Sequence, residues 1–70
     1  MRDAVGNILE DGDRATIIKD LKLGSSVIKQ GLRVTDIKIL EKEVNGHDLE
    51  GKVEGFGSLY LKSSVIKKSK

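Results

Sequence analysis

The stretch LRVTDIKIL, residues 32–40, decides the fold because its apolar positions change phase halfway along. Up to Val34 the apolar side chains fall at even positions, whereas Ile37 and Ile39 fall at odd positions. Side chains alternate between the two faces of a strand, so a regular strand cannot bury both sets on one side. We therefore expect a bulge or a sharp bend near Asp36, a device by which small sheets and barrels turn a corner.

Turns that contain glycine lie on both sides of this stretch. Asp11-Gly12 and Asn45-Gly46 suit tight hairpins, whose central residues take positive φ values. A third tight connection is expected around Phe56, which has a glycine on each side. These turns divide the chain into short segments, as in a small antiparallel sheet.

The segments between the turns alternate with a period of two, which indicates strands rather than helices. Five strands are expected, in residues 4–9, 14–20, 32–40, 49–55 and 58–62. The inward positions of the last two are expected to be Leu49, Gly51, Val53, Leu59 and Leu61, with Tyr60 outward. The final SSVIKK is expected to form a short helical or 3₁₀ turn, with Val65 or Ile66 closing one end of the core.

Five short strands joined by glycine-containing turns predict an all-β fold, either a small five-stranded barrel or a strongly bent sheet. Seventy residues correspond to one domain, residues 1–70. This length is close to the lower limit for a chain that folds without disulfide bonds or bound metal ions. The chain has no cysteine, so the domain must be held by apolar packing.

The net charge of +2 is unevenly distributed. Residues 1–41 contain seven basic and seven acidic residues, and residues 42–61 contribute a charge of −2. The segment 62–70 then adds four lysines and no acid, so all of the excess positive charge lies at the C-terminus. Such a basic end is typical of a solubilising, partly frayed tail, and this distribution argues against nucleic acid as the partner.

The N-terminal segment carries charges at Arg2, Asp3 and Glu10 and has no continuous apolar stretch, unlike a signal peptide. No run approaches the roughly 20 apolar residues of a membrane span. The sequence therefore predicts a cytoplasmic protein without a membrane partner.

The segment KDLKLGSSVIKQG, residues 19–31, is the best candidate for binding a small anion. Backbone N–H groups in a glycine-containing turn can hold a phosphate-like group, and lysines add charge. The candidate anion-binding residues are Lys22, Gly24, Ser25, Ser26 and Lys29. The spacing of a phosphate-binding P-loop is absent, however, so the favoured interpretation is a loop between two strands. A helix within residues 19–30 is the structural alternative, and the glycine and serines interrupt it.

Residues that could carry catalysis are few. The single histidine, His47, lies in a predicted hairpin turn and is interpreted as an exposed turn residue. Asp11 and Asp13 are closely spaced carboxylates in the predicted turn EDGD, but a calcium loop needs more oxygen ligands at fixed spacing. No catalytic residue, metal site or cofactor is therefore predicted.

Three segments carry a resemblance to a known family: DAVGNILEDGDRATIIKDLK (residues 3–22), GSSVIKQGLRV (24–34) and VEGFGSLYLKSSVIKK (53–68). Together they resemble the PhnA domain, the family called alkylphosphonate utilisation protein PhnA. The resemblance implies an SH3-like β-barrel. Longer members place a cysteine-rich zinc ribbon before this domain, and many have a lysine before the glycine of the serine loop, where this chain has Leu23.

Three functions remain open. The favoured hypothesis is a small non-enzymatic binding or interaction module, with a small anion or a protein as its partner. The resemblance implies a second, a phosphonoacetate hydrolase or accessory factor of phosphonate metabolism. A third is nucleic-acid binding, since SH3-like barrels of the KOW type open with a similar Gly-Asp and β-branched strand; Phe56 and Tyr60 are the only aromatic residues available for stacking on bases.

Overall fold

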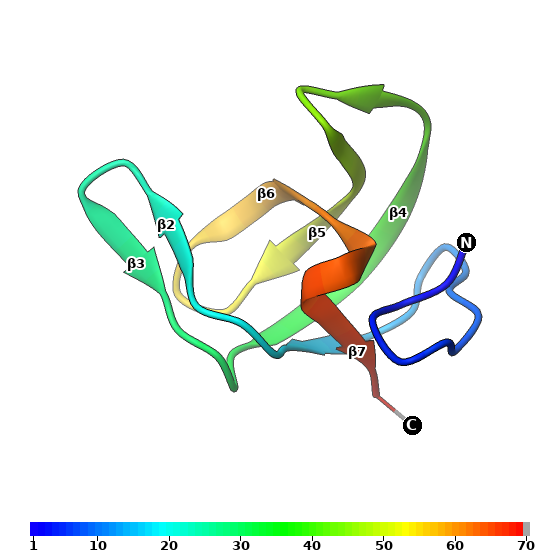
Figure 1. Cartoon of the computed structure of the whole chain (residues 1–70), viewed down its shortest axis with the longest axis horizontal. Coiled ribbons are helices and arrows are strands. Elements are labelled where there is room, and N and C mark those ends of the chain that lie inside the picture. Colours follow the sequence, from blue (N-terminus) through cyan, green and yellow to red (C-terminus); the bar gives the residue numbers. More distant parts are fainter. Residues whose placement is uncertain (70) are drawn as a thin grey trace.

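The computed structural model describes residues 1–69 and is all-β, as predicted (Figure 1). A short 3₁₀ helix, η1, is the helical element among these residues. The strands and η1 are β1 (Ala15–Ile17), β2 (Leu21–Leu23), β3 (Ser26–Ile28), β4 (Arg33–Val44), β5 (His47–Val53), β6 (Gly57–Leu61), η1 (Ser63–Val65) and β7 (Ile66–Lys68). None of these elements is a helix of the length and apolarity needed to cross a membrane.

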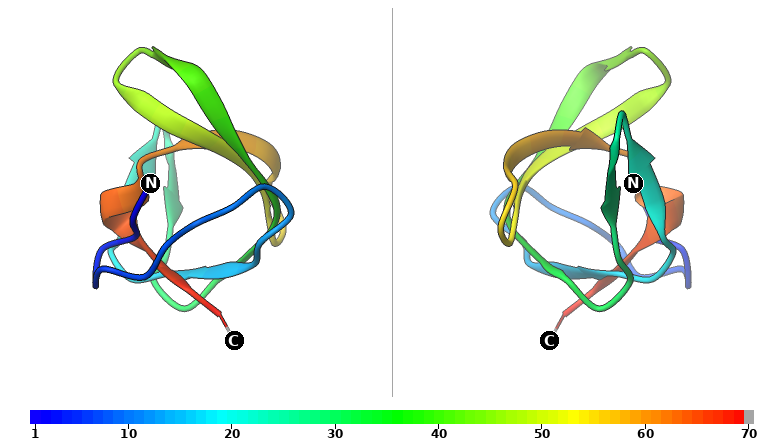
Figure 2. Two further views of the ribbon diagram at one scale, coloured as in Figure 1. Left: turned by 90° about the vertical axis from the view of Figure 1, so that its right-hand side faces the viewer. Right: turned by 90° about the vertical axis from the view of Figure 1, so that its left-hand side faces the viewer.

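Five strands form one antiparallel sheet in the order β6-β5-β4-β1-β7. Its edge strands, β6 and β7, are not hydrogen-bonded to each other, so within the described chain the sheet is open. Figure 2 shows that the sheet is strongly curved. The pair β2–β3 forms a separate two-stranded hairpin beside the sheet.

The predicted break in the long strand is confirmed. Asp36 has a φ of 52°, and the register between β4 and β5 shifts between Thr35 and Lys38. The extra residue of this bulge changes the phase of the strand, so Val34 and Ile37 are both buried although they are three residues apart. Ile39 packs against the core from a half-buried position.

The core lies on the concave side of the sheet and draws on nearly every strand. The predicted alternation is confirmed: Leu49, Gly51, Val53 and Leu61 are buried, Leu59 is half-buried and Tyr60 is exposed. The buried apolar residues are Leu9, Ala15, Ile17, Ile28, Val34, Ile37, Leu49, Val53, Leu61 and Ile66. Apolar packing thus supplies the cohesion that the absence of cysteine requires.

The predicted turns at Gly12 and at Asn45-Gly46 both occur, but the turn at Gly12 does not join two strands. Asn45 and Gly46 both have positive φ, 51° and 81°, and join β4 to β5 as a two-residue hairpin. Gly12, with a φ of 89°, is in a turn in which the Asp13 N–H donates to the Glu10 carbonyl at 3.1 Å. That turn follows a loop, because the strand expected before it does not form.

The prediction of a strand at residues 4–9 is wrong. Gly6 takes a φ of 90°, and the Asp3 carboxylate accepts hydrogen bonds from the backbone N–H groups of Val5 (3.0 Å) and Asn7 (2.8 Å). These side-chain-to-backbone bonds wind the segment into a compact loop in place of a ladder. The loop still buries Leu9 in the core.

The expectations for residues 19–31 and 62–70 also need correction. The first segment, expected as a loop between two strands, contains the short β2–β3 hairpin, and the alternative of a helix is wrong. In the second, the predicted 3₁₀ turn forms and Ile66 is fully buried, but residues 66–68 are not frayed. They form β7, which pairs with β1 at the edge of the sheet.

Candidate functional site

The five residues predicted to bind an anion lie on or next to the β2–β3 hairpin. Gly24 and Ser25 form its two-residue turn, and Gly24 has a φ of 61°. Lys22 is on β2, Ser26 begins β3, and Lys29 follows β3. All five are exposed. The glycine and serine at the tip therefore have a conformational role, which is to close a tight hairpin.

One of these five, Lys22, lines a groove. The hairpin leans over the sheet beside β6 (Figure 1) and encloses with it a groove of about 480 Å³, which we call the hairpin groove. Its apolar lining consists of Leu21, Ile28, Leu59, Leu61 and Val65, and its polar lining of Lys22, His47, Glu50, Ser58, Tyr60 and Lys62. A mostly apolar floor with a few polar groups is the usual composition of a small-molecule site.

The hairpin is held against the sheet by its own alternation. In the β2–β3 pair Leu21 is opposite Ile28, and both turn toward the core, whereas Lys22 is opposite Val27 on the other face. At the base of the hairpin the Asp20 carboxylate accepts a hydrogen bond from the Gln30 N–H at 2.9 Å. This bond ties the two ends of the segment together.

His47 is not the exposed turn residue that the sequence suggests. It is the first residue of β5, half-buried, and it lines the hairpin groove. Its Nδ1 lies 3.0 Å from the Val44 carbonyl oxygen. Because a carbonyl oxygen only accepts, the neutral ring carries its proton on Nδ1, and Nε2 is left as an acceptor.

Asp48 positions the part of the groove lining that comes from the segment around η1. Its carboxylate accepts hydrogen bonds from the Ser63 N–H and the Ser63 hydroxyl, each at 2.8 Å. These two bonds fix the start of η1 against β5. They thereby place Lys62 and Val65, which flank Ser63, on the groove's lining.

Asp11 and Asp13 both serve the fold. The Asp11 carboxylate accepts a hydrogen bond from the Ile39 N–H at 2.8 Å. The Asp13 carboxylate accepts one from the Glu10 N–H at 2.8 Å and pairs with the Lys68 ammonium at 3.3 Å. Among residues 1–69, no three histidine, cysteine or acidic side chains come together as a metal would require.

Comparison with known proteins agrees with the sequence motifs. A family model described as the PhnA domain matches residues 1–69. The chain belongs to the PhnA domain family. Protein YjdM of Escherichia coli (strain K12) is 45% identical to it over 71 residues, which cover 99% of this chain and 61% of that protein.

Two further relatives give the same picture. Protein YjdM of Streptococcus mutans is 44% identical over 68 residues, covering 94% of this chain and 59% of the relative. A YjdM homolog of Haemophilus influenzae is 38% identical over 72 residues, or 99% of this chain and 52% of the relative. This PhnA domain therefore spans about half to three fifths of the length of these relatives.

The sequence identifies one residue that lines the hairpin groove of this PhnA domain, Lys22, but it does not predict the groove itself. Lys22 was singled out, whereas Lys62 was counted only as part of a basic tail and His47 only as a turn residue. The groove brings together two segments separated by the whole of β4: the β2–β3 hairpin, and the segment from β5 to η1. The one available signal was the apolar pair Leu21 and Ile28 on either side of the Gly24-Ser25 turn, which indicates a hairpin with a buried face.

Proposed function

We propose that this PhnA domain is a single, non-enzymatic binding module that holds a small organic anion with an alkyl portion in its hairpin groove. It would do so as an SH3-like barrel acting in the cytoplasm. The observation that carries the proposal is the composition of the groove, whose lining combines apolar side chains with two lysines, Lys22 and Lys62. An alkyl chain fits the floor, and an anionic head group pairs with the ammonium groups.

Alkylphosphonates are the ligand class with this chemistry that the family label names. They combine a hydrocarbon chain with a compact, charged phosphonate. The volume of about 480 Å³ is within the range of small-molecule pockets, which is about 300–1,000 Å³. Glu50 also lines the groove and disfavours a second negative charge on the ligand, so a simple alkylphosphonate suits the groove better than a dicarboxylate.

Binding is favoured over hydrolysis by the roles of the polar residues. Cleavage of a carbon–phosphorus bond needs metal ions or an activated nucleophile beside a base. The Ser63 hydroxyl donates to Asp48 and the His47 Nδ1 is engaged by a backbone carbonyl, so each of these groups has a structural partner. A hydrolase of phosphonoacetate is the rival proposal, and the assay below separates the two.

The proposal is tested by mapping amide chemical shifts of the isotope-labelled chain with phosphate, methylphosphonate, propylphosphonate and phosphonoacetate. Shifts are expected at residues lining the hairpin groove, above all Lys22, Tyr60 and Lys62. A colorimetric assay of released phosphate runs on the same samples. Absence of any shift at millimolar propylphosphonate would remove the proposal, and release of phosphate from phosphonoacetate would establish the rival.

The length of the alkyl chain is expected to set the affinity. Each buried methylene contributes about 0.8 kcal/mol, so propylphosphonate should bind about tenfold more tightly than methylphosphonate. Inorganic phosphate, which has no alkyl group, should bind most weakly. Titrations followed by amide shifts give the dissociation constants. Equal affinities for the three ligands would show that the apolar floor is not part of the site.

Replacing both groove lysines should weaken binding. The variant Lys22→Gln/Lys62→Gln removes both charged donors. A hydrogen bond to a charged group is worth about 1.5 kcal/mol, so the affinity for propylphosphonate should fall by about tenfold or more. The matched control is Lys19→Gln/Lys29→Gln, which removes the same charge from exposed positions outside the groove lining. If the control loses as much affinity, the ligand is at the predicted loop of Gly24, Ser25, Ser26 and Lys29.

A further inference from the structure

A second surface, on the convex face of the five-stranded sheet, gathers positive charge from distant parts of the chain. Strand pairing places Thr16 of β1 between Arg33 of β4 and Lys67 of β7. Arg14 precedes Thr16 by two residues and therefore shares its face. Neighbouring strands lie about 4.8 Å apart, so three strands bring these cations within about 10 Å across the sheet. We call Arg14, Arg33 and Lys67 the basic strip.

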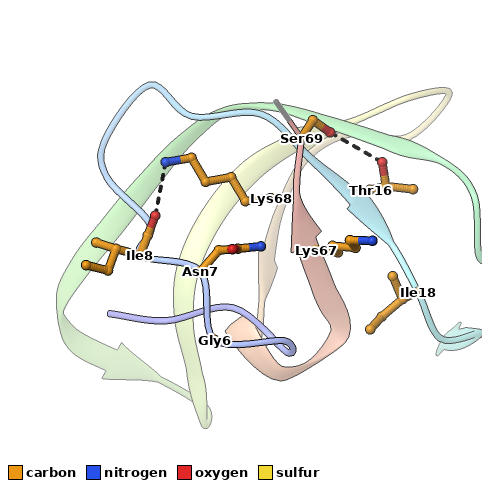
Figure 3. Close-up of a pocket in the computed structure, with 8 residues that line it drawn as sticks. All are labelled: Gly6, Asn7, Ile8, Thr16, Ile18, Lys67, Lys68 and Ser69. Carbon is orange, nitrogen blue, oxygen red and sulfur yellow. Dashed lines mark hydrogen bonds between the residues drawn. The ribbon is translucent and has the colours of Figure 1, made fainter.

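Hydroxyl groups lie among the cations of the basic strip. Arg14, Arg33, Thr16, Thr35 and Ser69 line one shallow pocket of about 330 Å³. Thr16 and Ser69 also border the adjoining hollow that contains Lys67 (Figure 3). Their hydroxyl oxygens are 3.4 Å apart, and the figure shows this contact with Lys67 beside it. The two hollows share Thr16 and Ser69, and the one that contains Lys67 is also lined by Ile8 and Ile18.

The charge of the basic strip is not neutralised within the described part of the chain. The ion pairs there join Lys52 to Asp36 and Lys68 to Asp13, and neither involves the strip. Two acidic residues border the strip: the Glu54 N–H donates to the Arg33 carbonyl at 3.0 Å on the β5 side, and Asp13, which precedes Arg14, pairs with Lys68. All three cations are exposed.

We propose that the basic strip binds the sugar–phosphate backbone of a nucleic acid without reading its sequence. Guanidinium groups match phosphate oxygens, and threonine and serine hydroxyls are common phosphate contacts. The face is open and extended, which suits a polymer crossing several strands. Among the described residues that line the two hollows there is no aromatic side chain on which a base could stack, so discrimination among sequences is not expected.

The test uses fluorescein-labelled duplex and single-stranded DNA of about 20 nucleotides, with anisotropy measured over a series of salt concentrations. Three phosphate contacts predict a slope of log affinity against log salt of about −2.7 for duplex and about −2 for single strands. The variant Arg14→Gln/Arg33→Gln/Lys67→Gln should lose about tenfold or more in affinity at low salt.

A charge-matched control, Lys29→Gln/Lys38→Gln/Lys42→Gln, removes three exposed cations outside the strip and should change affinity less than about threefold. An equal loss in the control would overturn the proposal, because net charge alone would then explain binding. So would a lack of binding at low salt.

Amide shifts of the unaltered chain provide a readout that does not depend on variants. Oligonucleotide should move the amides of Arg14, Thr16, Arg33 and Lys67, whereas inorganic phosphate at the same phosphate concentration should leave them nearly unmoved. Equal shifts with phosphate would identify a small-anion site and overturn the nucleic-acid proposal. Shifts confined to the hairpin groove would overturn it too, independently of whether that groove binds alkylphosphonates.

Discussion

Asp3→Ala is expected to lower the free energy of unfolding by about 2–4 kcal/mol, because one buried carboxylate holds the N-terminal loop to the opposite end of the chain. Its Oδ1 accepts from the Val5 and Asn7 N–H groups at 3.0 and 2.8 Å. Its Oδ2 accepts from the Asn7 side-chain amide at 3.1 Å and from the Lys68 N–H at 2.6 Å. Alanine leaves these donors without their acceptor.

The same carboxylate should make stability depend on acidity. Burial alone would raise the pKa of Asp3, but the hydrogen bonds from Lys68, Asn7 and Val5 outweigh it and lower the pKa from 3.8 to about 2. The folded state therefore binds the proton less readily than the unfolded state. The stability that Asp3 contributes is complete above pH 3.8 and is lost as the pH falls toward 2.

Urea unfolding followed by circular dichroism over this pH range measures both effects. Asp3→Asn should be destabilised at neutral pH, and its difference from the unaltered chain should shrink as the pH falls from 3.8 toward 2. Asp36→Asn is the control: that aspartate is exposed, its pairing with Lys52 is at the surface, and asparagine tolerates its positive φ. It should change stability by less than about 0.5 kcal/mol. A constant difference between Asp3→Asn and the unaltered chain over the whole pH range would contradict this account of Asp3.

Features set by neighbouring residues could be predicted from the sequence. The bulge at Asp36 follows from the change of phase between Val34 and Ile37, and the Asn45-Gly46 turn follows from the φ preferences of those residues. In each case the physical cause lies within a few positions of its effect. The alternation that buries Leu49, Gly51 and Val53 is equally local.

Features set by distant partners could not be predicted in this way. Residues 4–9 contain enough apolar residues to resemble a strand, but their shape depends on Asp3 and on its bond to Lys68, 65 positions away. The same holds for the basic tail: its lysines become part of a surface only because Ile66–Lys68 adds to the edge of β1. The distribution of charge along the sequence does not reveal that pairing.

The candidate site falls between these cases. The turn at Gly24 follows from the local sequence, and anion binding there stays a prediction, because glycine, serine and lysine occur together in both kinds of loop. The groove depends on how the hairpin rests on β6 and η1, and its lysines come from two distant segments. One of them, Lys22, could be named from the sequence; Lys62 required the fold.

Gly51→Ala is expected to destabilise the domain by about 1–3 kcal/mol, although glycine within a strand is usually the poorer residue. Elsewhere in a strand, alanine would gain roughly 0.5–1 kcal/mol over glycine. Gly51 faces the bulge of β4, and a Cβ there would lie 2.5 Å from Val34 Cγ1 and 3.5 Å from Ile37 Cγ1. Both neighbours are buried, so they cannot move aside into solvent.

The double variant Gly51→Ala/Val34→Ala distinguishes this steric cause from a general effect of the substitution. Val34→Ala alone should cost about 2 kcal/mol through the cavity that it leaves. It also removes the methyl group that a new Cβ would strike, so the double variant should be more stable than the sum of the single effects by about 1 kcal/mol. Ser58→Ala, at an exposed position on β6, should lie within about 0.5 kcal/mol of the unaltered chain. Additive losses in the cycle would mean that the bulge at Asp36 leaves room for a side chain opposite it, contrary to the packing that makes the bend in β4 possible.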